Sequence, residues 1–145
     1  EGFDFGNSPY HYMDDRIKGQ TLVITTTNGT QAIEVSKDAY KVVIGSFLNI
    51  DSLCSWLVRQ EKDILLLCSG WKNKFNLEDS LFAGAVTEEL LLRSDKYHHG
   101  DGCLALKYLY QMAKQDPVKF RLSLTDNPRA RRLVHPCGSA APLVR

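Results

Sequence analysis

Three short apolar runs, each followed by a turn and then a helix-like stretch, constrain the fold of this chain most strongly. They cover residues 21–26, 41–45 and 63–68. Within each run the apolar residues are nearly continuous and do not alternate with polar ones, which is typical of strands buried on both faces of a parallel sheet. With helices between the runs, the pattern predicts the α/β class: a three-layer α/β/α domain with a mostly parallel sheet and right-handed crossovers.

Helices are predicted after each run and again later in the chain. The first is expected to end near Lys37. Capping side chains predict where the later helices begin: Asp51 or Ser52, Asn76 or Asp79, Asp101, Pro117 and Asp126. We therefore expect one α/β domain over residues 1–134. Residues 135–145, rich in Pro, Gly, Ser and Ala, are expected to form an irregular tail.

The turn after the first run, residues 25–30, combines four threonines with an Asn-Gly pair. Hydroxyls, a glycine that lets backbone come close, and the free N–H groups of a starting helix suit an anion such as phosphate. An ordinary strand–turn–helix connection capped by Thr27 or Asn28 explains the same residues, and residue types alone favour it.

A pair of acidic residues follows the third run. In an open α/β sheet, ligands collect at the carboxyl ends of the strands. That edge would hold residues 25–30, 46–49 and 69–71, and the last of these leads into Glu78 and Asp79. We expect these groups to converge on one rim, where adjacent carboxylates would suit Mg²⁺. For a bare Glu-Asp pair, stabilisation of the positive end of a helix is the commoner explanation.

Composition excludes several classes of protein. A net charge of +1 gives no overall field that would attract nucleic acid or an anionic membrane. No apolar run approaches a membrane span, and no signal peptide is recognisable. None of the four cysteines is spaced as C-x-x-C, which disfavours structural zinc. The apolar surroundings of Cys54 and Cys68 indicate buried thiols in a reducing compartment, so we expect a cytoplasmic protein.

Six motifs, in order along the chain, resemble those of the 2-phosphosulfolactate phosphatase family. They are residues 6–9, 25–30, 45–49, 70–71, 78–79 with 83–85, and 101–102, and together they extend over residues 2–133. Members of that family are longer and carry an additional N-terminal half. The resemblance therefore implies that this chain corresponds to the family's second half and is part of a longer two-lobed protein.

The resemblance also implies an activity and a set of site residues. The family consists of Mg²⁺-dependent phosphatases that hydrolyse (R)-2-phospho-3-sulfolactate to 3-sulfolactate and phosphate, a step towards coenzyme M, so the implied partner is a small anionic phosphate ester. Onto matching positions we assign roles that the resemblance itself does not settle: phosphate binding by Thr26, Thr27, Asn28, Gly29, Thr30 and Asn49, metal binding by Glu78, Asp79 and Asp101, and catalysis by Asn7, Asn28 and Asp79.

Two other functions stay open. One is a non-catalytic or incomplete fragment that binds ligand or a partner chain. Such a fragment would expose an apolar sheet edge or face, and a homo-oligomer would cover it. The other is a phosphatase for a different small hydroxy-acid or sugar phosphate, which only a panel of substrates would distinguish.

Overall fold

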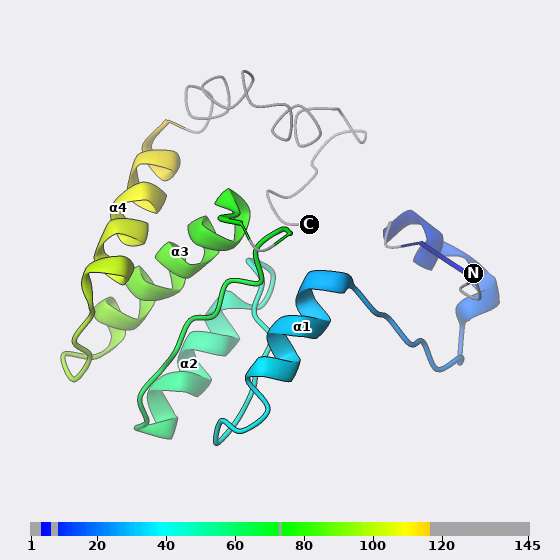
Figure 1. The fold of residues 1–145 in the computed structure, drawn as a ribbon, viewed down its shortest axis with the longest axis horizontal. Helices are drawn as coiled ribbons and strands as arrows, with labels where there is room; N and C mark the ends of the chain where they lie inside the picture. Colours follow the sequence, from blue (N-terminus) through cyan, green and yellow to red (C-terminus); the bar gives the residue numbers. More distant parts are fainter. Residues whose placement is uncertain (1–3, 7–8, 73, 117–145) are drawn as a thin grey trace.

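The computed structural model describes residues 4–6, 9–72 and 74–116, whose arrangement is shown in Figure 1. Two short 3-10 helices, Pro9–Met13 and Asp15–Ile17, precede the α-helices. The α-helices of this part of the chain are α1 (Thr27–Val35), α2 (Ile50–Gln60), α3 (Leu77–Arg93) and α4 (Asp101–Gln115). These helices are confirmed, whereas those predicted after Pro117 and Asp126, and the tail at 135–145, lie outside the described residues.

The predicted sheet is absent from the described residues, so the three-layer α/β/α prediction is wrong. Residues 21–26, 41–46 and 63–70 form no strand. The isolated bridge found in this part of the chain joins Trp71 to Lys74. Exposure shows the physical reason. Side chains along 64–69 alternate between half-buried and exposed, so helices cover this run on one face only. A parallel sheet needs cover on both faces.

Helix α3 lies at the centre of the fold, and α4 packs closely along it (Figure 1). Eight residues of α3 are buried, including Leu81, Val86 and Leu90. Gly84 permits the close approach, because a Cβ atom at this position would lie 2.1 Å from the Leu106 carbonyl oxygen of α4. The small residues at 83–85, part of the family resemblance, therefore act in helix packing.

Helix α2 is joined to α3 by an apolar core and by an arginine clamp. The buried members of the core are Cys54, Leu57, Val86 and Leu90. At the end of α3, the Arg93 guanidinium donates to Glu89 Oε2 at 2.8 Å, Asp51 Oδ1 at 2.7 Å and Ser55 Oγ at 2.6 Å. These bonds, led by those to Glu89, raise the pKa of Arg93. The clamp fixes the end of α3 against the first turns of α2.

Helix α1 is peripheral by comparison. None of its residues is buried. Its N-cap is Thr26, whose Oγ1 accepts a hydrogen bond from the Gly29 N–H at 3.1 Å. The sequence suggested Thr27 or Asn28 as the cap, so the observed capping residue lies one or two positions earlier. In the part of the chain that the structure describes, no helix is both long and apolar enough to cross a membrane.

Candidate active site

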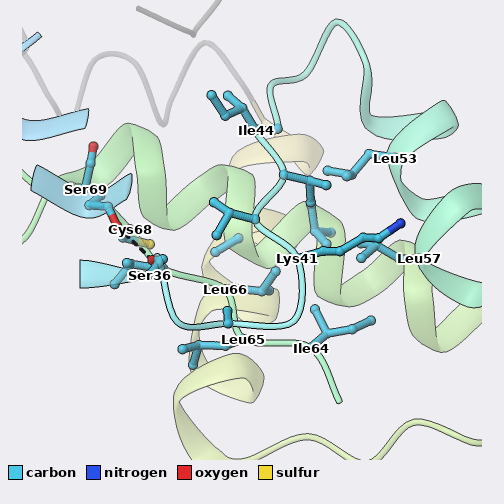
Figure 2. Close-up of a pocket in the computed structure, with 18 of the residues that line it drawn as sticks. Ser36, Lys41, Ile44, Leu53, Leu57, Ile64, Leu65, Leu66, Cys68 and Ser69 are labelled. Carbon is cyan, nitrogen blue, oxygen red and sulfur yellow. Dashed lines mark hydrogen bonds between the residues drawn. The ribbon is translucent and has the colours of Figure 1, made fainter. Parts of the chain in front are cut away.

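A groove of about 690 Å³ lies between α1, α2, α3 and the non-helical segments 39–46 and 62–69. Its walls are mostly apolar, and Figure 2 shows Leu53 and Leu57 on α2 with Ile64 and Leu66 on the segment 62–69. One end is polar and is lined by Gly29, Ser46, Ser69, Glu78 and Asp79. Gly29 and the Glu-Asp pair, far apart in the sequence, therefore line the same groove.

Asp79 holds the loop that follows the third apolar run. Its Oδ2 accepts hydrogen bonds from the Gly70 N–H at 2.7 Å and from the Ser69 hydroxyl at 3.2 Å. The first is short and charge-assisted, the stronger class of hydrogen bond. Its Oδ1 accepts none from the described residues. One carboxylate oxygen thus positions the loop, and the other remains available for a ligand.

Asn28 holds the same loop from the side of α1. Its Oδ1 accepts a hydrogen bond from the Lys72 N–H at 3.4 Å. The loop needs unusual backbone geometry to reach both partners: φ is +68° at Gly70 and +51° at Lys72. A Cβ at Gly70 would lie 2.7 Å from the Lys74 carbonyl oxygen, so only glycine fits without a shift. Asn28 and Asp79, two predicted catalytic residues, are therefore linked through one strained loop.

Glu78 is half-buried at the start of α3. Burial, followed by the negative charge of Asp79, raises the pKa of Glu78 to about 7. Both residues belong to the first turn of α3, where the Asn76 side chain accepts from their N–H groups at 2.8 and 3.3 Å. The helix cap thus sets the backbone of the acidic pair, and the groove holds negative charge that lacks a counter-ion among the described residues.

The predicted phosphate-binding residues separate into two sets. A hollow of about 370 Å³ outside the groove is lined by Thr25, Thr26, Thr27, Thr30 and Gln31. Within it, the hydroxyls of Thr25 and Thr30 lie 3.2 Å apart, and the Thr26 N–H donates to Thr30 Oγ1 at 3.4 Å. Gly29 instead lines the groove, and Asn28 contacts the loop at 69–72. The turn therefore presents hydroxyls to one cavity and Gly29 to the other.

Three further predicted site residues lie apart from the Glu-Asp pair or beyond the description. Asn49 closes its own turn: Oδ1 accepts from the Ser46 N–H at 2.8 Å, and Nδ2 donates to the Ile44 carbonyl at 3.1 Å. Asp101 is an exposed residue in the first turn of α4, whose N-cap is Gly100. Asn7 lies outside the described residues.

The acidic pair fits a Mg²⁺ ion that takes most of its ligands from elsewhere. Among residues 4–6, 9–72 and 74–116, no group of three or more His, Cys, Asp or Glu is placed to hold a metal. Glu78 and Asp79 thus offer two carboxylates without Asp101. Mg²⁺ is commonly bound by one or two carboxylates, with water and substrate phosphate completing its shell. Burial and the charge of Asp79 raise the pKa of Glu78, and a cation bound beside it would oppose this shift by favouring the charged form.

Sequence reasoning assigned no role to Ser69, Gly70 or Lys72. All three contact Asp79 or Asn28, two of them through backbone N–H groups. The sequence offered one signal for them, namely a Ser-Gly pair that directly follows an apolar run and shortly precedes the acidic start of a helix.

Comparisons with known proteins identify the family to which this chain belongs. A family model described as 2-phosphosulpholactate phosphatase matches residues 1–135, most of the chain. The chain belongs to the 2-phosphosulfolactate phosphatase family. Similar proteins named "Probable 2-phosphosulfolactate phosphatase" include those of Thermotoga petrophila, 43% identical, and Thermotoga maritima, 41% identical, each over 111 residues.

Coverage of these relatives is partial. The two Thermotoga matches cover 77% of this chain but 46% of each relative, so the chain spans about half the length of the curated relatives it matches. The relative from Caldanaerobacter subterraneus, 37% identical, is covered to the same extent. No solved structure matches the chain.

Proposed function

We propose that this chain forms part of the active site of a Mg²⁺-dependent phosphatase acting on 2-phospho-3-sulfolactate, in the pathway to coenzyme M. Family membership supports the reaction class. The observation that carries the proposal for these residues is the convergence of Asn28 and Asp79 on the loop at 69–72, next to Glu78. These groups come from three separate parts of the sequence and meet at one end of the groove.

Each residue has a proposed role that agrees with its contacts. Glu78 and Asp79 would hold the metal, with Asp79 Oδ2 keeping the loop in place and Oδ1 available to the cation. Bound Mg²⁺ would neutralise phosphate charge and activate water. Asn28 would orient the phosphate ester through its amide, and the hydroxyls of Thr26, Thr27 and Thr30 would bind its anionic oxygens.

Three of the proposed roles have no support from the described contacts. Asn49 is engaged in its own turn, so binding phosphate would require its amide to exchange partners. Asp101 begins α4 beside the C-terminal end of α3, whereas Glu78 and Asp79 lie in the first turn of α3, so the described geometry separates it from the acidic pair (Figure 1). Asn7 keeps its proposed catalytic role with no described contact. Cytoplasmic location also stays a prediction, consistent with the free thiols of Cys54, Cys68 and Cys103.

The test is phosphate release from (R)-2-phospho-3-sulfolactate, with Mg²⁺ and with EDTA. Full activity should require Mg²⁺, and Asp79→Asn should lower kcat/KM about 100-fold or more, because it removes a metal ligand and the charged loop contact. Asp95→Asn is the matched control, since Asp95 is exposed and lies outside the groove. Unchanged release by Asp79→Asn, or equal rates in EDTA, would contradict the proposal.

A second candidate function follows from the coverage of the relatives. A chain that spans 46% of a relative can contribute the loops described above without completing a catalytic site. In that case the chain binds phosphate ester or metal but releases no phosphate. Calorimetric titration with inorganic phosphate, run beside the activity assay, separates binding without turnover from catalysis. A panel of hydroxy-acid and sugar phosphates separates the proposed substrate from related esters.

A further inference from the structure

A tight turn ends the loop that Asp79 and Asn28 hold. The Trp71 N–H donates to the Lys74 carbonyl and the Lys74 N–H donates to the Trp71 carbonyl, both at 3.1 Å. Within the turn, the Lys72 N–H donates to Asn28 Oδ1 at 3.4 Å, and the N–H of the glycine before Trp71 donates to Asp79 Oδ2 at 2.7 Å. The turn is therefore fixed between the residues that the proposed function assigns to the phosphate ester and to the metal.

The backbone of Lys72 is strained. Its φ of +51° lies in the left-handed region, which favours glycine and which a long side chain adopts only at a cost in free energy. Strain of this kind persists where surrounding contacts fix the backbone, and it is common at functional sites. The feature that lysine adds over glycine at this corner is its charged side chain, so a function for Lys72 belongs to its ammonium group.

The ammonium group of Lys72 has no acidic partner in the described part of the chain. It lies 4.6 Å from the centre of the Trp71 ring, and no ion pair joins it to a described carboxylate. Other exposed lysines do have such a partner, namely Lys18, Lys37 and Lys96. Contact with the indole face restricts the direction of the cation without neutralising it. Lys72 is therefore an exposed positive charge that an anion could bind.

We propose that Lys72 binds a second acid group of the substrate, a sulfonate or a carboxylate, and so makes the site selective for phosphate esters that carry one. The inference rests on the proposed function, in which Mg²⁺ on Glu78 and Asp79 neutralises the phosphate group alone. The remaining acid groups of the ester then need a separate cation. Lys72 meets this need, because its turn is bonded to both halves of the site and a charge-assisted hydrogen bond is the stronger class.

The first test compares three esters that share a three-carbon skeleton. 2-Phospho-3-sulfolactate carries a sulfonate and a carboxylate, 2-phosphoglycerate carries the carboxylate alone, and glycerol 2-phosphate carries neither. Lys72→Met should raise KM for esters that carry the bound acid group by roughly tenfold or more, with kcat little changed. KM for glycerol 2-phosphate should stay the same. A loss for the sulfolactate ester alone assigns the contact to the sulfonate, and a loss for both acidic esters assigns it to the carboxylate.

Further variants separate loss of charge from loss of folding. Lys72→Gly removes the ammonium group and suits the positive φ, so the turn keeps its geometry and the variant should behave as Lys72→Met does. Lys72→Arg keeps the charge and should retain most of the selectivity. Lys107→Met is the matched control, because the Lys107 ammonium also lies over an aromatic ring, 5.6 Å from the centre of Tyr108, but outside the loop and the groove.

A binding measurement tests Lys72 without turnover. Calorimetric titration of the chain with 3-sulfolactate, in Mg²⁺ and at low ionic strength where exposed charges are least screened, should show binding. Lys72→Met and Lys72→Gly should each weaken the dissociation constant roughly tenfold or more, and Lys107→Met should not.

The outcomes distinguish this proposal from the phosphatase proposal. Selectivity and sulfolactate affinity that are unchanged in both Lys72 variants, or no binding of sulfolactate by the wild-type chain, would overturn the role of Lys72. Wild-type release of phosphate could persist in that case, and the proposed reaction would stand. A chain that binds sulfolactate through Lys72 but releases no phosphate supports the role of Lys72 and contradicts the reaction alone.

Discussion

Helices α3 and α1 show how unevenly this chain distributes its stability. Eight of the residues of α3 are buried, whereas none of the residues of α1 is. Both helices begin with a capped first turn that carries proposed site residues: Glu78 and Asp79 on α3, Asn28 on α1. One half of the candidate site therefore stands on the core of the fold, and the other half depends on a few polar contacts with the loop at 69–72.

The largest expected effect lies where α3 meets α4. Gly84→Ala should destabilise the chain by about 3 kcal/mol, because its Cβ would overlap the Leu106 carbonyl of α4. Denaturant unfolding followed by circular dichroism measures this loss. Gly102→Ala is the control: nothing lies within 4 Å of a Cβ there, so we expect a change within about 0.5 kcal/mol. Equal effects of the two substitutions would contradict the close packing of α3 against α4.

A matched pair of valine truncations compares the two regions directly. Val86→Ala in α3 should cost about 2 kcal/mol, because a fully buried side chain leaves a cavity. Val35→Ala in α1 should change stability by less than about 0.5 kcal/mol, since that side chain is 76% exposed. The same unfolding assay serves both variants. A larger effect at Val35 would show that α1 is packed by residues beyond those described.

Removing a helix cap should destabilise either helix, but only the cap of α3 should affect global unfolding. Asn76→Ala removes two hydrogen bonds from the start of α3 and should reduce the free energy of global unfolding by about 1 kcal/mol. Thr26→Ala should instead speed amide exchange within α1 and leave global unfolding almost unchanged. Global destabilisation by Thr26→Ala would mean that α1 unfolds together with the core.

The smallest predicted effect is a pH dependence at Glu78. An ordinary glutamate titrates near 4.5, and burial raises the pKa of Glu78 to about 7. The folded chain therefore retains a proton that the unfolded chain releases between these values. Stability should fall as pH rises through that window, by roughly 1 kcal/mol after allowing for partial exposure. Glu78→Gln should remove this contribution when measured in EDTA. Glu34→Gln, on exposed α1, should retain it.

The positions of the helices could be predicted because they follow from local chemistry, but three of the four α-helices have their N-cap earlier in the sequence than predicted. Asn76 caps α3 as expected. The N-cap residues of α1, α2 and α4 are Thr26, Asn49 and Gly100, each one or more positions before the residues proposed from sequence. Several neighbouring polar residues can serve as a cap, and the one that does depends on where the incoming chain turns.

The sheet could not be predicted correctly, because apolar runs record a preference for burial and not the presence of a pairing partner. Residues 63–68 contain the expected apolar side chains, yet their exposure alternates and they form no backbone–backbone hydrogen bond with another described residue. In the candidate site, Glu78, Asp79 and Asn28 were identified by residue type and position. Gly70 and Lys72 were missed because they take part through backbone N–H groups, which no side-chain pattern records.

The loop held by Asn28 and Asp79 contains one of the two tryptophans of the chain. Trp71 is partly exposed, and the ammonium group of Lys72 lies 4.6 Å from the centre of its ring. Anything that draws Asp79 away from the Gly70 amide would change the polarity around the indole and hence the wavelength of its emission. In a Trp56→Phe variant, which lacks the other tryptophan, the emission of Trp71 would report whether the acidic pair is occupied.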